Sequence, residues 1–165
     1  MTRLSPWFAS AIGTTLLALL LGAGVGPAAD NTAEVNKFQG TWYSVSTELD
    51  GEQKTGITKD EQHIFSGNKW TRKVKDQVVS EATFTVKELK PYWVITLKYT
   101  VPEKKKDAHW LAIYRFDGDT LQWIGDNVAL LNEVKEEDYK KLPKAFETKK
   151  GDGNFMRTLR RLSDK

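Results

Sequence analysis

Few residues of this sequence have the type and spacing that an active site or a metal centre requires. The chain has two histidines, His63 and His109, and no cysteine. A zinc site needs three or four ligands, usually with local spacing, and the sequence has no His-x-His or Cys-x-x-Cys pattern. We therefore interpret both histidines as surface residues or as buried residues with satisfied nitrogens, and we expect no metal and no cofactor.

The motifs of covalent catalysis and of phosphate binding are also missing from the sequence. It has no Gly-x-Ser-x-Gly segment and no cysteine thiol that could act as a nucleophile. Glu136 and Glu137 belong to a strongly charged segment, for which a solvated surface is the ordinary explanation. The glycines Gly151 and Gly153 lack the lysine and the helix of a phosphate-binding loop. We predict that the protein is not an enzyme.

Aromatic side chains are the more informative group. Alternate residues of a strand point to the same side, and five aromatic residues fall on the apolar sides of three successive predicted strands: Trp93, Tyr99, Trp110, Tyr114 and Trp123. We predict that these side chains bind a small apolar or amphipathic molecule by burying its apolar surface. The alternative is that the same rings fill the interior, because each aromatic side chain buries roughly 150 to 250 Å².

The elements that must position these rings are short strands. Segments rich in β-branched and aromatic residues, bounded by turn residues, are residues 41–48, 62–65, 69–74, 78–86, 92–100, 108–116, 120–124 and 154–162. Gly67 and Gly118 lie between neighbouring strands, where hairpin turns favour a positive φ. We predict an all-β fold, an eight-stranded antiparallel up-and-down barrel whose outer face is exposed to water.

Two segments do not have the strand pattern. Residues 30–37 form a polar lead-in with one or two expected helical turns, for which Thr32 is a possible cap. Residues 130–146 carry apolar residues at helical spacing among charges, which predicts one short helix before the last strand. Asn132 is the expected start of that helix and Pro143 its stop.

The first 29 residues have the pattern of a cleavable signal peptide. Arg3 precedes an apolar stretch of about 15 residues, and Ala28 and Ala29 provide small residues for cleavage. That stretch is shorter than the roughly 20 residues that span a bilayer, and no second one follows. We predict a signal peptide at residues 1–29 and one exported domain at residues 30–165, periplasmic or extracellular, without a membrane span.

The net charge excludes one class of partner. The whole chain has 25 basic and 22 acidic residues, and removal of residues 1–29 removes only Arg3 from that count. Lysines and glutamates are interspersed, whereas a dedicated nucleic-acid-binding protein gathers its positive charge on one face. We expect no nucleic-acid partner.

Four motifs occur in an order that resembles a known family. Residues 38–42 read FQGTW, residues 113–121 read IYRFDGDTL, residues 143–146 read PKAF, and residues 159–161 read LRR. This pattern resembles the lipocalin-like domain of unknown function that is common in exported planctomycete proteins. The resemblance implies a lipocalin-like barrel in which Gly40 and Trp42 form the Gly-x-Trp motif. It also implies that Trp42 lies beneath Arg161, or Arg157 in another register, as a structural pair, and it brings no established activity.

The sequence therefore predicts an exported, non-catalytic, lipocalin-like protein that binds a small apolar or amphipathic ligand in its barrel, as a monomer. The alternative is a filled barrel that acts as a protein-interaction module in the cell envelope. Its candidate surfaces are residues 101–107, which include Lys104, Lys105 and Lys106, and the charged segment 132–141.

Overall fold

The computed structural model describes residues 31–55, 60–101, 106–126 and 130–162. In chain order, the described elements are α1 (Thr32–Phe38), β1 (Gly40–Leu49), β2 (Glu52–Thr55), β3 (Glu61–Ser66), β4 (Lys69–Val74), β5 (Gln77–Leu89), β6 (Tyr92–Val101), β7 (Lys106–Asp117), β8 (Thr120–Asp126), α2 (Glu136–Lys140) and β9 (Asn154–Arg161). The predicted signal peptide and lysines Lys104 and Lys105 lie outside the described residues. Within those residues, no helix is long and apolar enough to cross a membrane.

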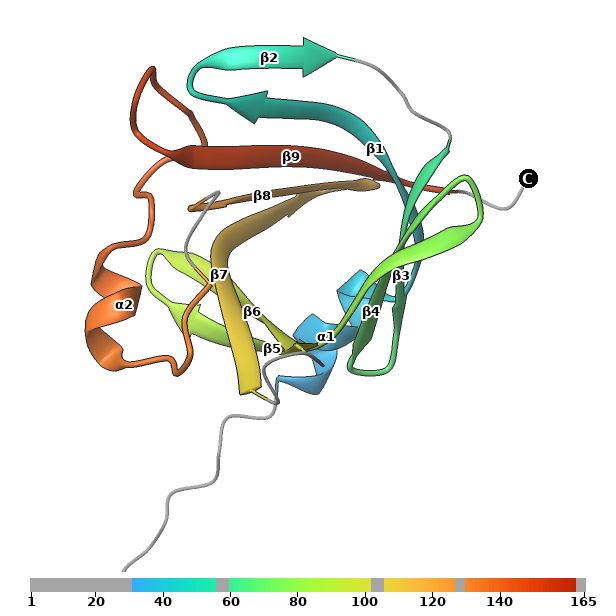
Figure 1. The fold of residues 1–165 in the computed structure, drawn as a ribbon, viewed down its shortest axis with the longest axis horizontal. Helices are drawn as coiled ribbons and strands as arrows, with labels where there is room; N and C mark the ends of the chain where they lie inside the picture. The colour runs from blue at the N-terminus through green and yellow to red at the C-terminus, as the bar shows by residue number, and fades with distance from the viewer. Residues whose placement is uncertain (1–30, 56–59, 102–105, 127–129, 163–165) are drawn as a thin grey trace, which may run out of the picture.

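Eight of the strands close into an antiparallel barrel (Figure 1). Each strand from β3 to β8 pairs with the next one along the chain, β1 pairs with β3, and β9 returns to pair with β1. The predicted eight-stranded up-and-down barrel is confirmed, and each of the eight predicted segments corresponds to one of its strands. The short strand β2, which the sequence analysis did not predict, pairs with the second half of β1.

The alternation along the strands sets an apolar interior. Trp93, Tyr114 and Trp123 are paired across β6, β7 and β8, so their side chains lie on the same face of the sheet. All three belong to the main core or pack against it. The predicted inward face of these three strands is confirmed.

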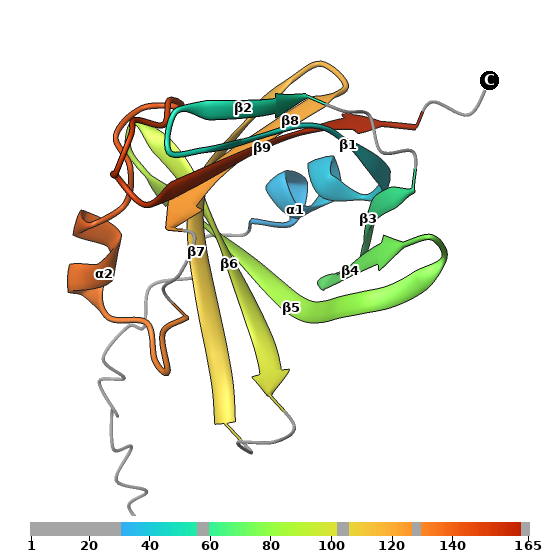
Figure 2. The same cartoon turned by 45° about the horizontal axis from the view of Figure 1, so that its top comes forward.

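Helix α1 plugs the interior from one end. Figure 2 shows it between the strands on two sides of the barrel, whereas α2 lies outside. Its last residue, Phe38, has no exposed surface and packs against the rings of Phe65, Phe84 and Tyr114. The predicted cap at Thr32 is wrong by one residue, because Asn31 is the N-cap. The Asn31 side chain instead connects the helix to β5, since its Nδ2 donates a hydrogen bond to Val86 O at 2.8 Å.

Part of the outer face of the barrel is buried, which corrects the prediction that this face is exposed to water. Val94, Ile113 and Ile124 point outward from β6, β7 and β8 and are nevertheless buried. The chain between β8 and β9 covers them through Tyr139, Leu142 and Phe146, and Met156 on the neighbouring strand β9 packs against the same cluster. The alternation correctly separated the two faces, but it did not reveal that a later segment folds over the outer one.

The predicted short helix before the last strand is confirmed as α2, with a different start. The helix begins at Glu136 with Lys135 as its N-cap, and Lys135 N donates to Asp138 Oδ2 at 3.0 Å. Asn132 therefore does not cap it, because it lies before the helix in an irregular segment. The helix ends at Lys140, before Pro143, as predicted.

Candidate functional site

The barrel interior has a filled half and an open half. In the filled half, the Phe38 ring centroid lies 4.8 to 5.3 Å from those of Phe65, Phe84, Tyr114 and Phe116, so aromatic rings occupy the space. In the open half, a cavity of about 910 Å³ opens to the surface. Side chains therefore fill one half of the barrel interior, and the other half is an open cavity.

The Gly-x-Trp motif lies at the closed end. The Arg161 guanidinium is 4.4 Å from the ring centroid of Trp42, and its Nη1 and Nη2 donate to Gln39 O and Lys37 O, each at 2.6 Å. Those carbonyls end helix α1, so Arg161 ties the plug to strand β9. Gly40 has a φ of +111°, which lets the chain turn from the helix into β1. The pair implied by the resemblance is thus in contact, and its contacts are structural.

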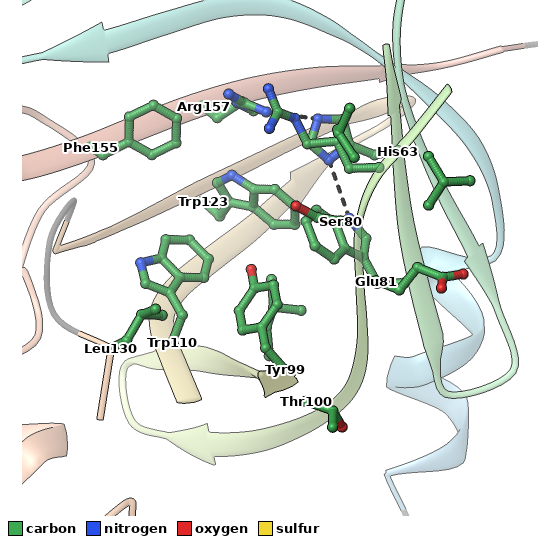
Figure 3. Close-up of a pocket in the computed structure, with 15 residues that line it drawn as sticks. His63, Ser80, Glu81, Tyr99, Thr100, Trp110, Trp123, Leu130, Phe155 and Arg157 are labelled. Carbon is green, nitrogen blue, oxygen red and sulfur yellow. Dashed lines mark hydrogen bonds between the residues drawn. The ribbon is translucent and has the colours of Figure 1, made fainter. Parts of the chain in front are cut away.

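The five aromatic residues of the predicted ligand site separate into two groups. Tyr99, Trp110 and Trp123 line the open cavity, and Figure 3 shows their rings grouped together on one side of it. Trp93 and Tyr114 instead line a separate depression of about 570 Å³ beside α1. The Trp110 and Trp123 rings pack edge to face with centroids 5.8 Å apart.

A polar cluster in the wall of the cavity was missed by the sequence analysis. His63 on β3, Arg72 on β4 and Arg157 on β9 line the cavity, and all three contact Glu61 on β3. Glu61 Oε1 accepts hydrogen bonds from Arg72 Nε at 2.8 Å, from His63 Nε2 at 3.1 Å and from Arg157 Nη1. The sequence did contain a signal for this cluster. Each of these residues lies two or four positions from an inward-facing residue of its own strand, namely Phe65, Trp70 or Leu159, so alternation places it on the same face.

The geometry fixes the protonation of His63. Trp70 Nε1 donates to His63 Nδ1 at 3.2 Å, and an indole nitrogen can only donate, so Nδ1 carries the lone pair. The ring proton is then on Nε2, facing Glu61. Arg157 Nη1 lies 2.8 Å from that Nε2, and because both nitrogens carry protons, Glu61 is their shared acceptor.

Burial sets the charges of the cluster. His63 has no exposed surface, and burial lowers its pKa to about 4, although its hydrogen bond to Glu61 opposes that shift. Burial alone would raise the pKa of Glu61, but the hydrogen bond from His63 and the guanidiniums of Arg157 and Arg72 bring it down to about 2. At neutral pH the cluster therefore holds two guanidiniums, one carboxylate and a neutral imidazole.

Two hydrogen-bond donors at the cavity lack acceptors. Trp123 Nε1 and Arg157 Nε are buried and have no partner among the residues that the structure describes. The two residues are direct cross-strand partners on β8 and β9, and both line the cavity. Buried N–H groups are nearly always paired in folded proteins, so this pair of donors needs an explanation.

The mouth of the cavity has an apolar rim. Val78, Val79 and Leu130 line it and are 52%, 47% and 58% exposed. They are three of the four large apolar residues that are exposed within the described ranges, the fourth being Leu162. The large exposed apolar residues of the described chain are thus concentrated at the mouth of the cavity.

The second histidine takes no part in this site. His109 lines a separate hollow on the outer face of β7, together with Asp107 and Glu133. No group of three or more His, Cys, Asp or Glu residues in the described part of the chain has the geometry to hold a metal ion.

No protein-family model matches this chain, and no curated protein or solved structure matches it. Function is therefore inferred from the residues of the site.

Proposed function

We propose that this protein binds a small apolar or amphipathic molecule in the open half of its barrel. The observation that carries the proposal is the cavity of about 910 Å³, walled by Trp70, Tyr99, Trp110 and Trp123. Ligand pockets for small molecules span roughly 300 to 1,000 Å³ and are mostly apolar, with a few polar groups. The cavity has that size and that lining.

The driving force of binding is the burial of apolar surface. Each buried methylene group contributes about 0.8 kcal/mol, and aromatic walls add contact with a flat or flexible ligand. The exposed side chains of Val78, Val79 and Leu130 at the rim supply an apolar route into the cavity. A filled barrel would need neither the cavity nor this rim.

We propose that the role is non-catalytic. Nδ1 of His63 accepts a hydrogen bond from Trp70, and Nε2 faces Glu61 and Arg157, so the imidazole has no lone pair directed at a ligand. Glu61 is likewise engaged by three donors. A general base needs an accessible lone pair within hydrogen-bond reach of its proton, and neither the His63 imidazole nor Glu61 Oε1 offers one.

We also propose that the protein acts outside the cytoplasm. The pattern of residues 1–29 supports this, as does the likeness of the motifs at residues 38–42 and 113–121 to an exported lipocalin-like domain. The test is the mass of the protein recovered from the cell envelope or the medium. Cleavage after Ala28 or Ala29 is expected, and a full-length chain confined to the cytoplasm would contradict it.

The ligand-binding proposal is tested with N-phenyl-1-naphthylamine, a neutral apolar dye that becomes fluorescent in apolar sites. The purified protein should bind it saturably. Ser80→Trp places an indole in the cavity from β5 and should reduce the affinity at least tenfold. The control Thr83→Trp places the same ring on the exposed face of that strand and should bind normally. Dye affinity that is equal in both variants would contradict binding in the cavity.

Native mass spectrometry of the protein purified from its own source addresses the natural ligand. A discrete adduct of a few hundred daltons that disappears on denaturation would support the proposal and reveal the ligand class. A bare mass together with a co-purifying protein would instead favour the interaction-module alternative.

A further inference from the structure

We propose that the ligand carries a single negative charge, with a carboxylate as its simplest form, and that this headgroup binds between Arg157 and Trp123. This inference rests on the proposed function and adds the class of ligand to it. Its basis is the polar wall of the cavity, since the apolar walls do not distinguish one headgroup from another.

The first argument is the pair of donors without acceptors. Arg157 Nε and Trp123 Nε1 are buried at the cavity and find no acceptor among the described residues. Trp123 is only 2% exposed, and its cross-strand pairing places it directly beside Arg157 (Figure 3). Two adjacent N–H donors match the two acceptor oxygens of a carboxylate, whereas an amine or another donor would leave both without an acceptor.

The second argument is the charge of the wall. Arg72 and Arg157 share the single carboxylate of Glu61, and His63 is neutral between them, which leaves one positive charge uncompensated. Glu81 also lines the mouth, but its side chain is exposed, and Figure 3 shows it directed away from the rings. The Arg157 side chain is only 12% exposed, and a largely buried positive charge favours an anion as its partner.

The third argument is that Arg157 is held in place before any ligand arrives. Its Nη1 is fixed by Glu61, and its guanidinium lies 5.0 Å from the ring centroid of Phe155 on the same strand. Glu61 therefore orients the guanidinium and leaves Nε without an acceptor. An oriented donor loses less conformational entropy on binding than a flexible surface lysine does.

The test uses three ligands with the same ten-carbon chain and different headgroups: decanoate, decan-1-ol and decyltrimethylammonium. Each competes with N-phenyl-1-naphthylamine for the purified protein at pH 7.4. Decanoate should bind about tenfold more tightly than decanol, since a hydrogen bond to a charged group contributes on that scale, and the cation should bind most weakly.

Variants assign the effect to named residues. Arg157→Met should lower the decanoate affinity about tenfold, to the level of decanol, and leave decanol binding unchanged. Trp123→Phe, which removes the indole N–H, should produce a smaller loss that is again confined to decanoate. Arg160→Met is the matched control, because Arg160 is exposed on the same strand, and it should change none of the three affinities.

The outcomes separate this inference from the proposed function. If the dye binds but decanol or the cation binds as tightly as decanoate, the headgroup inference is overturned and apolar binding stands. If neither the dye nor any decyl compound binds, both proposals fail. If Arg157→Met does not fold, as judged by near-ultraviolet circular dichroism, the three-ligand comparison and Trp123→Phe still decide the matter.

Discussion

Glu61, His63, Arg72 and Arg157 are the residues whose presence in the interior is hardest to explain by stability alone. Removing charged groups from water is costly, and a buried ion pair is often no more stabilising than apolar side chains of the same volume. Perturbed pKa values near a cavity are typical of functional sites. We infer that these residues are retained to give the cavity wall its charge and its oriented donors.

The buried histidine predicts how stability depends on pH. The pKa of His63 is lowered from 6.5 in the unfolded chain to about 4 in the folded protein, chiefly by burial. The unfolded state therefore binds a proton at a higher pH than the folded state does, so stability is present above pH 6.5 and is lost as pH falls toward 4. Between pH 7 and pH 5, the free energy of unfolding should fall by about 2 kcal/mol, as measured by urea denaturation.

His63→Gln isolates that contribution, because its amide keeps the hydrogen-bonding capacity and has no charge to gain. The variant should lose most of the dependence between pH 7 and pH 5. Glu61 titrates in a lower range, between its unfolded pKa of 4.5 and its folded pKa of about 2. A steep pH dependence that persists in His63→Gln would show that another group is responsible.

At the scale of elements, α1 and the segment around α2 perform different tasks. Helix α1 fills one half of the interior and is tied to β9 through Arg161. The α2 segment packs on the outside of β6, β7 and β8, with Tyr139 and Leu142 against Val94, Ile113 and Ile124. One element closes the barrel, and the other covers an apolar outer patch that would otherwise be exposed.

The tie between α1 and β9 predicts a large effect for Arg161→Met. The substitution removes the contact with Trp42 and two hydrogen bonds to the end of α1, so the free energy of unfolding should fall by roughly 2 to 4 kcal/mol. Arg160→Met on the same strand removes an exposed guanidinium and should stay within about 0.5 kcal/mol of the original. If urea titrations showed equal losses of unfolding free energy in the two variants, Arg161 would not connect α1 to β9 in the way described.

Because the segment around α2 packs on the outside of the barrel, a substitution in it should lower stability without lowering ligand affinity. Leu142→Ser introduces a hydroxyl into the cluster over Ile113 and should lower the free energy of unfolding by about 1 to 3 kcal/mol. Affinity for N-phenyl-1-naphthylamine should not change, because this cluster lies outside the barrel. A parallel fall in dye affinity would indicate that the cover and the cavity are coupled.

At the scale of the whole molecule, the barrel is polarised along its axis. The plug and the Trp42–Arg161 pair occupy one end, and the cavity, its cationic wall and its apolar rim occupy the other. An eight-stranded barrel has room either for side chains or for one small ligand, and this molecule divides its interior between packed side chains and an open cavity. In our proposal, stability and binding are thus assigned to different ends of one barrel.

That division predicts that the rim can be altered without destabilising the fold. Leu130→Ser together with Val79→Ser removes exposed apolar surface from the mouth, so the free energy of unfolding should change by no more than about 0.5 kcal/mol per substitution. Dye affinity should fall severalfold, because the rim is part of the apolar surface that the ligand covers. If a fluorescence titration showed unchanged dye affinity, the rim would not be part of the binding surface.

The sequence by itself determined the strands and their inward faces. Alternation of apolar and polar residues is a local property with a period of two, and turn residues such as Gly118 are equally local. The short helix before the last strand also followed from local spacing. The sequence could not show that Val94, Ile113 and Ile124 are covered, because the covering segment lies elsewhere along the chain.

The tertiary structure alone decided which inward residues share the cavity. Inward-facing residues on neighbouring strands meet only if the stagger of the strands brings them to the same height in the barrel, and that stagger is set by closure of the whole sheet. Tyr99, Trp110 and Trp123 line the cavity, whereas Trp93 and Tyr114 line the depression beside α1, although Tyr114 and Trp123 are cross-strand partners. Closure of the sheet also brings Glu61, on β3, to Arg157 on β9, 96 positions later in the sequence. Each strand carried its part of the site, and only closure of the barrel joined the parts.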